Sequence, residues 1–128
     1  MVIQTTNKNY VDLVQTMYMA FNSRDMDEWT KYFDEDTLDY VPSLKEPLKG
    51  RKAIRENNEE FIKGIPDVSF EMTNIFGQNN WVCAEGIVSG TYAHSKKSFR
   101  VPVCMVAKFE GEIVREIHEY FDQQSFQV

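Results

Sequence analysis

The spacing of hydrophobic residues in the first part of the chain is typical of helices. Apolar side chains recur at three- and four-residue steps over residues 10–21, so the pattern predicts a helix with one buried face from about residue 7 to residue 22. Asp25 is followed three residues later by Glu28, an Asp version of a capping box. This pair predicts a second, short helix that ends near Phe33.

The next segment is predicted to hold a brief strand, a loop and a third helix. The strand is expected over residues 37–41, and Pro42 ends it because proline cannot donate a hydrogen bond to a sheet. Residues 47–50, which begin with proline and end with glycine, are predicted to form a loop. Good helix formers occupy residues 51–63, and a glycine followed by Pro66 ends this last helix.

After Pro66 the hydrophobic period changes to the two-residue alternation of strands. Four strands are expected: one up to a turn at residues 79–80, one over about 81–94, one that alternates strictly over 99–109, and one over about 112–124. Helices followed by long antiparallel strands predict an α+β fold. We therefore expect a single domain over residues 1–128, with the helices packed on one face of a curved antiparallel sheet.

Composition and charge narrow the possible functions. With 42% hydrophobic and 27% charged residues, the composition is that of a globular protein. Twenty acidic against fourteen basic residues give a net charge of -6, so nucleic acids and anionic membrane surfaces would repel the protein. The longest apolar run is far below the roughly 20 residues that cross a bilayer, and the N-terminal residues do not resemble an export signal. We expect a soluble, cytoplasmic protein with neither nucleic acid nor membrane as its partner.

The cysteines and histidines are too few and too scattered for a structural zinc site. The chain has Cys83 and Cys104, each among apolar neighbours, and His94 and His118. The pattern favours two buried, reduced thiols and predicts no metal ligands. His94 lies beside a predicted turn, where an exposed histidine is the expected interpretation.

The last predicted strand carries the main group of titratable side chains. Two-residue alternation puts Glu116, His118, Tyr120 and Asp122 on one face. The other face carries Ile113, Arg115, Ile117, Glu119 and Phe121. General acid-base chemistry needs groups whose pKa moves toward neutrality on partial burial, and the first row offers such groups. An antiparallel sheet also often turns one polar face to water, so alternation alone leaves a catalytic row and a solvated face both open.

The order of elements and several short phrases resemble the SnoaL-like branch of the superfamily that shares its fold with nuclear transport factor 2 and ketosteroid isomerase. The resemblance covers nearly the whole chain, and it rests on the order and spacing of phrases that are each weak alone. The phrases are Phe21-Asn22-Ser23-Arg24-Asp25, Tyr32-Phe33, Gly50-Arg51-Lys52-Ala53-Ile54-Arg55, Ile65-Pro66-Asp67, Ser89-Gly90-Thr91, Gly111-Glu112-Ile113-Val114 and Tyr120-Phe121-Asp122.

The resemblance implies a cone-shaped fold whose concave sheet and helices enclose a pocket for a small, largely apolar or aromatic ligand. It also implies a role for Asp122. In polyketide cyclases of this family, the aspartate that ends the Tyr-Phe/Trp-Asp phrase acts as the acid-base group of a ring closure that needs no cofactor or metal. Asp122 occupies that position here.

The chain departs from the isomerase branch at three key positions. Met17 stands where the isomerases carry a tyrosine, and Val41 before Pro42 stands where they carry the catalytic aspartate. Their second pocket aspartate falls on Cys104 or Met105. Steroid-type isomerisation is therefore not expected.

A set formed by Asp122, Arg100 and Asp39 could imitate the Asp-Arg-Asp site of limonene-epoxide hydrolases, although the motif does not match residue by residue. Asp39 shares a strand face with Val41 and is a candidate for ligand binding. It also follows Asp34, in an acidic turn of the kind that is often solvated, so both interpretations stay open.

Strand parity and residue chemistry suggest roles for five further residues. His118 is expected to orient Asp122 or to share its proton. Tyr120 and Tyr40 would donate hydrogen bonds to a developing oxyanion, and Trp81 and Tyr92 would shape the cavity.

The resulting hypothesis is a SnoaL-like enzyme that performs acid-base chemistry on an apolar carbonyl compound without a cofactor. The alternative is a non-catalytic domain that binds a small ligand or mediates assembly, because one fold hosts many functions. We also expect a homodimer that forms through the outer face of the sheet, since relatives in this fold often pair in this way and mixed outer faces tend to be covered.

Overall fold

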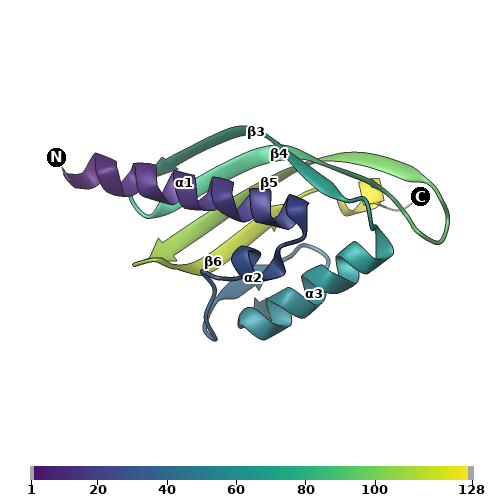
Figure 1. The fold of residues 1–128 in the computed structure, drawn as a ribbon, viewed down its shortest axis with the longest axis horizontal. Helices are drawn as coiled ribbons and strands as arrows, with labels where there is room; N and C mark the ends of the chain where they lie inside the picture. Colours follow the sequence, from purple (N-terminus) through teal and green to yellow (C-terminus); the bar gives the residue numbers. More distant parts are fainter. Residues whose placement is uncertain (1, 127–128) are drawn as a thin grey trace.

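Three helices and six strands make up the fold in the computed structural model, which describes residues 2–126 and the side chains from residue 10 onwards (Figure 1). The helices are α1 (Val2–Ser23), α2 (Met26–Trp29) and α3 (Arg51–Gly64). The strands are β1 (Leu38–Tyr40), β2 (Leu48–Lys49), β3 (Ser69–Gln78), β4 (Trp81–Thr91), β5 (Ser98–Glu110) and β6 (Ile113–Tyr120), and a 3-10 helix, η1 (Gln123–Phe126), follows them.

All three predicted helices are present, although α1 begins at Val2 rather than near residue 7. On α1, Met17 and Phe21 lie four residues apart and both are buried. The predicted cap of α2 is confirmed, because the Glu28 backbone N–H donates to Asp25 Oδ1 at 3.1 Å. The helix ends at Trp29 rather than near Phe33, since the chain turns there into short-range backbone hydrogen bonds such as that from Phe33 N–H to the carbonyl of Thr30.

The strands form one sheet in the order β2-β1-β6-β5-β4-β3. The predicted antiparallel pairing of the four long strands is confirmed, and the fold is an α+β cone. Two features go beyond the prediction. The segment predicted as a loop contains the two-residue strand β2, and β1 pairs with β6 in parallel, with Asp39 opposite Ile117 and Tyr40 opposite His118.

Two strands end earlier than predicted, and turns explain both ends. β4 stops at Thr91, because the Tyr92 N–H donates to the carbonyl of Lys97 and closes the connection to β5. β6 stops at Tyr120, because the backbone N–H of Gln124 donates to Asp122 Oδ1 at 3.0 Å and starts η1. Asp122 therefore lies outside the strand.

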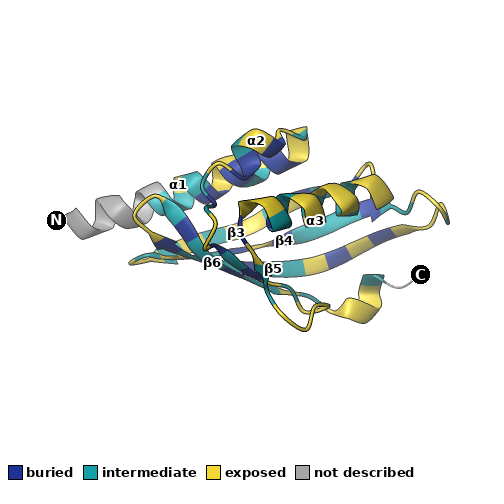
Figure 2. Ribbon diagram, turned by 90° about the horizontal axis from the view of Figure 1, so that it is seen from below, coloured by how far each residue is buried: buried dark blue, intermediate teal, exposed yellow. Residues whose placement is uncertain are grey.

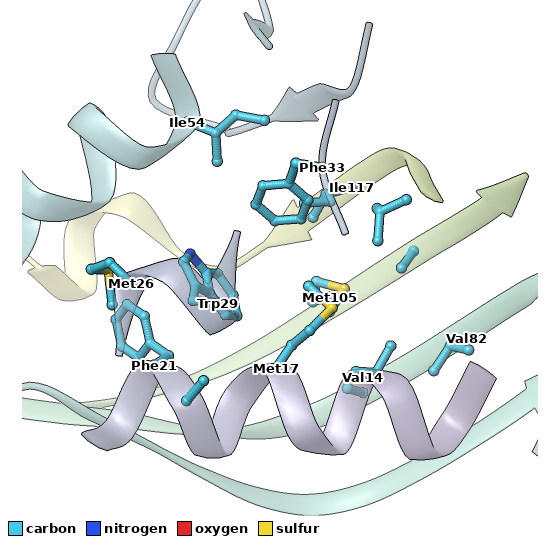
Figure 3. Packing of buried hydrophobic residues seen from close by; sticks show 14 of the residues in the cluster. Val14, Met17, Phe21, Met26, Trp29, Phe33, Ile54, Val82, Met105 and Ile117 are labelled. Atoms are coloured by element: carbon cyan, nitrogen blue, oxygen red, sulfur yellow. The ribbon is translucent and has the colours of Figure 1, made fainter. Parts of the chain in front are cut away.

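The hydrophobic core lies between the helices and the concave face of the sheet. Side chains from α1, α2 and α3 meet those of β4, β5 and β6 there, with Trp29 and Phe33 beside Met17 and Met105 (Figure 3). Figure 2 shows the resulting alternation of buried and exposed positions along the strands. Of the helices within residues 2–126, none is long and apolar enough to cross a membrane.

Candidate functional site

A cavity of about 680 Å³ lies between the helices and the concave face of the sheet. This volume is in the range of pockets that hold drug-sized ligands. Its wall is largely apolar and contains eight aromatic residues: Tyr18, Phe21, Trp29, Phe61, Phe70, Tyr92, Phe121 and Phe126. Its size and lining make this cavity the candidate site for a small ligand.

Two carboxyl groups lie together in the wall of this cavity, Asp39 on β1 and Glu119 on β6. The parallel pairing of these strands sets Asp39 opposite Ile117, so Glu119 is the next residue of β6 on the same face. The Asp39 and Glu119 side chains are within hydrogen-bonding reach of each other. Asp39 is 2% exposed, whereas the accessible part of Glu119 faces the cavity.

The environment favours one shared proton between these carboxyl groups. Burial raises the pKa of Glu119 well above its usual value, and the charge and hydrogen bond of Asp39 raise it further. Burial also raises the pKa of Asp39, while the hydrogen bond from Glu119 and the charge of His118 oppose this rise. Asp39 Oδ1 is buried and has no hydrogen-bond partner within the described part of the chain. A proton on Glu119, whose pKa is raised well above its usual value, would join the two carboxyl groups by a hydrogen bond.

Tyr18 on α1 is the third titratable group of the site. Burial raises the pKa of its hydroxyl well above the usual value, and the charges of Glu119 and Asp39 add to the rise. Its ring stacks on Phe70, with ring centroids 4.3 Å apart, and lies 5.1 Å from the ring of Trp29. Tyr18 therefore stays neutral and keeps an O–H group as a donor beside the carboxyl pair.

The position of Asp122 differs from the prediction. Asp122 is exposed at the start of η1, where its carboxylate accepts a hydrogen bond from the Gln124 backbone, and it is not among the residues that line the cavity. The prediction assumed that β6 continues to residue 124 with strict alternation. Because the strand ends at Tyr120, alternation does not carry Asp122 into the cavity.

Four other predicted site residues lie on the outer, convex face of the sheet. The rings of Tyr40 and His118 stack there with centroids 4.5 Å apart, and Glu116 Oε1 lies 2.9 Å from His118 Nε2. Trp81 and Tyr120 are 39% and 57% exposed on the same face. The structure brings these residues together, but on the side of the sheet opposite the cavity, so their predicted contact with a cavity ligand is corrected.

Two predicted site residues do line the cavity. Asp39 is one, and the open question about its surroundings is resolved in favour of burial. Tyr92 is the other; it packs on Phe99, and its hydroxyl donates to the backbone carbonyl of Phe126 in η1. Tyr92 thus holds the C-terminal turn against the cavity.

Sequence reasoning missed Glu119 and Tyr18. Glu119 lies between Ile117 and Phe121 in the more apolar row of β6, and an acidic residue in such a row is a signal of a buried carboxyl group. Tyr18 belongs to the predicted buried face of the first helix, where an aromatic residue is usually part of the core. Only the pairing of distant elements shows that the two meet.

The cysteines are half-buried and free, rather than fully buried as predicted. Their Sγ atoms lie 3.6 Å apart across β4 and β5, and burial raises the pKa of Cys83 to about 11. Among the described residues, no group of three or more His, Cys, Asp or Glu side chains could hold a metal ion.

Comparison with known proteins gives one family and a set of similar folds. The model of a family described as a SnoaL-like domain matches residues 14–117. None of the curated proteins matches the chain.

Solved structures resemble the chain at low sequence identity. A protein described as a SnoaL-like polyketide cyclase from Jannaschia Sp. CCS1 is 15% identical over 92% of this chain and 88% of its own, with a TM-score of 0.84. Bal32a, from a soil-derived mobile gene cassette, is 22% identical over 91% and 92%, with a TM-score of 0.82. A protein with a ketosteroid isomerase-like fold from Catenulispora acidiphila DSM 44928, in complex with trimethylamine, is 18% identical over 88% and 87%, with a TM-score of 0.80. At these identities the likeness shows the fold.

Proposed function

We propose that the cavity of this chain, which belongs to the SnoaL-like domain family, binds a small, largely apolar ligand and that Asp39 and Glu119 transfer protons to and from it. The observation that carries the proposal is the buried carboxyl pair of Asp39 and Glu119, in which Asp39 Oδ1 has no hydrogen-bond partner among the described residues and burial raises both pKa values. Two carboxyl groups whose surroundings separate their protonation states are a recurring basis of acid-base catalysis.

The proposed reaction begins with proton abstraction from a carbon atom next to a ligand carbonyl group. Asp39 takes the proton, and the electron pair of the C–H bond moves into the carbonyl group to form an enolate. Once Asp39 is protonated, the carboxyl proton of Glu119 is free to bind the ligand. This proton and the hydroxyl of Tyr18 then donate hydrogen bonds that stabilise the enolate oxygen. Return of the proton to carbon or oxygen completes the cycle. No cofactor enters these steps.

Exchange of carbon-bound hydrogen tests the proposal without knowledge of the natural substrate. Propiophenone and 1-tetralone are incubated with the protein in D2O, and loss of the α-proton signal is followed by NMR. We expect the protein to accelerate exchange, and Asp39→Asn and Glu119→Gln each to slow it about a hundredfold or more, which is the usual effect of losing a general acid-base group. Asp122→Asn and Glu116→Gln are matched controls, and both should retain the parent rate.

A non-catalytic ligand-binding domain is the second candidate function. Two observations favour it: Asp122, the family's expected acid-base position, is exposed, and aromatic residues dominate the cavity wall. If the ketones bind but no carbon-bound hydrogen exchanges, the catalytic proposal is wrong and this second function replaces it. If the parent accelerates exchange and the Asp39 and Glu119 variants do so equally, these two residues are not the acid-base pair.

The outer face of the sheet supports the additional proposal of a homodimer. The strand register aligns Phe76, Cys83, Val106, His118 and Tyr40 in one row across β3, β4, β5, β6 and β1. Phe76 is 55% exposed and Tyr40 is 37% exposed. Large exposed aromatic side chains on one face are typical of protein interfaces, and we propose that a second copy of this chain covers them.

A further inference from the structure

Among the described side chains, the cavity wall holds three carboxyl groups, one histidine and neither lysine nor arginine. The carboxyl groups are those of Asp39, Glu119 and Glu60. Glu60 lies at the rim, is 75% exposed, and already pairs with Lys63 at 3.5 Å. His94 also lines the cavity, but it is exposed in the connection between β4 and β5. The buried carboxyl groups therefore have no lysine or arginine beside them in the wall.

Three carboxylates outside the cavity, in contrast, each lie beside a basic side chain. Asp27 pairs with Arg55 at 2.6 Å, Asp34 pairs with Arg115 at 2.9 Å, and Glu116 faces His118 at 2.9 Å. Within the cavity, Asp39 and Glu119 have only each other, so one shared proton leaves one negative charge on the pair. His118 lies on the opposite face of the sheet, and its electrostatic effect on Asp39 is smaller than the effect of burial. An unpaired charge in an apolar cavity is unfavourable, and a positive group brought by a ligand would relieve it.

The remaining wall suits a cation as well. Tyr18 and Trp29 line the cavity together with Phe21 and Phe70, and their rings pack at 4.3 to 5.2 Å between centroids. Aromatic faces attract ammonium groups, most strongly where water is excluded. The same rings give favourable contact to the apolar part of a ligand.

We propose that the cavity takes a lipophilic amine, with its ammonium group against the Asp39–Glu119 pair and its apolar body among the aromatic rings. The proposal rests on the carboxyl pair of the function proposed above and concerns the class of ligand that this pair attracts. The carboxyl pair discriminates in three ways: it attracts an ammonium group, tolerates a neutral hydroxyl or carbonyl group, and repels a carboxylate. The amine also carries the donor N–H that Asp39 Oδ1 accepts once Glu119 turns toward the ligand.

Three probes with the same aromatic body test this expected order of affinity, which is amine, then alcohol, then acid. Isothermal titration calorimetry at pH 7 compares 1-naphthylmethylamine, 1-naphthalenemethanol and 1-naphthoic acid, which share an aromatic body and differ in charge. We expect the amine to bind at least about tenfold more tightly than the alcohol, because a hydrogen bond to a charged group is stronger than a neutral one. The acid should bind most weakly.

Variants identify the source of the preference. The double variant Asp39→Asn/Glu119→Gln should bind the alcohol within about threefold of the parent and lose the preference for the amine. Glu60→Gln, which removes the rim charge, should keep the preference, and so should Asp122→Asn. Melting curves of all variants check that each is folded.

Equal or tighter binding of the alcohol by the parent protein overturns the inference, and so does an amine preference that persists in the double variant. Binding of none of the three probes also overturns it. The ketone exchange experiment is independent of these results: exchange without amine preference refutes the ligand class and leaves the acid-base function standing. Amine preference without exchange supports the ligand class in a binding protein.

Discussion

β6 carries acidic residues with opposite surroundings on its two faces. Glu116 lies on the convex face, 28% exposed, and its carboxylate is 2.9 Å from the ring nitrogen of His118. Glu119, three residues later, faces the concave side, where Asp39 is its partner and burial raises its pKa well above the usual value. One strand thus holds Glu116 beside His118 on its outer face and Glu119 beside the carboxyl group of Asp39 on its inner face.

The difference teaches that residue type and strand parity do not identify a reactive group. Glu116, His118 and Tyr120 are a richer set of polar side chains than a single glutamate, yet their face is open to solvent. Water and a hydrogen-bond donor stabilise a carboxylate, whereas an apolar wall and a second carboxyl group raise its pKa. The convex face therefore suits contact with another surface, and the concave face suits chemistry.

The same contrast between a cavity-facing and a solvent-facing side chain occurs on α1, where two methionines two residues apart face opposite sides. The largest predicted effect, on the free energy of unfolding, is expected there. Met17 is 1% exposed and lines the cavity, while Met19 is 71% exposed. We expect Met17→Ala to lower the free energy of unfolding by about 2–5 kcal/mol, the usual cost of truncating a buried methionine. Met19→Ala should change it by less than about 0.5 kcal/mol. Urea denaturation measures both, and equal costs would contradict the described orientation of α1.

A smaller effect is expected in the pH dependence of stability. The folded protein holds the protons of Asp39 and Glu119 more tightly than the unfolded chain, because both pKa values are raised. Their contribution to stability is therefore complete at low pH and is lost as the pH rises above 4.5, the ordinary pKa of glutamate, through the raised values. The variant Asp39→Asn/Glu119→Gln has no carboxyl groups at these positions, so it does not lose this stability as the pH rises.

Thermal unfolding between pH 4 and pH 9 measures the difference. We expect the melting temperature of the double variant to rise relative to that of the parent with increasing pH, by several degrees across the range. Asp34 and Asp67 have lowered pKa values, and because both proteins carry them, their effects at acidic pH cancel in the comparison. A constant difference over the whole range would show that the carboxyl pair is not perturbed by folding.

The elements of the fold were predictable because their signals are local. The three- and four-residue spacing of α1, the cap at Asp25 and the alternation along β5 each lie within a short window. The ends of β4 and β6 were not predictable, since backbone and side-chain hydrogen bonds at Tyr92 and Asp122 decide them. β2 is only two residues long and carries no pattern of its own.

The candidate site depended on contacts that no local pattern contains. Asp39 and Glu119 meet because β1 pairs in parallel with β6, and Tyr18 joins them from α1. Alternation correctly grouped Glu119 with Ile117 and Phe121 but could not tell which row faces the cavity, since both rows are mixed. An irregularity in the pairing of β5 with β6 also shifts the alternation near Arg115.

Substitutions on the convex face, where the proposed dimer contact lies, are expected to change the stability of the single chain least. Phe76 and Tyr120 are 55% and 57% exposed, so Phe76→Glu/Tyr120→Glu should leave the secondary structure unchanged and place two charges in the contact. Burying these charges without partners would oppose pairing. Sedimentation at about 10 μM should give twice the chain mass of 15.0 kDa for the parent and a single chain for the variant. Met19→Glu adds a charge on the helical side of the molecule and should stay dimeric. A parent protein that sediments as one chain, or a variant that still pairs, would show that the exposed aromatic residues of this face do not hold two copies together.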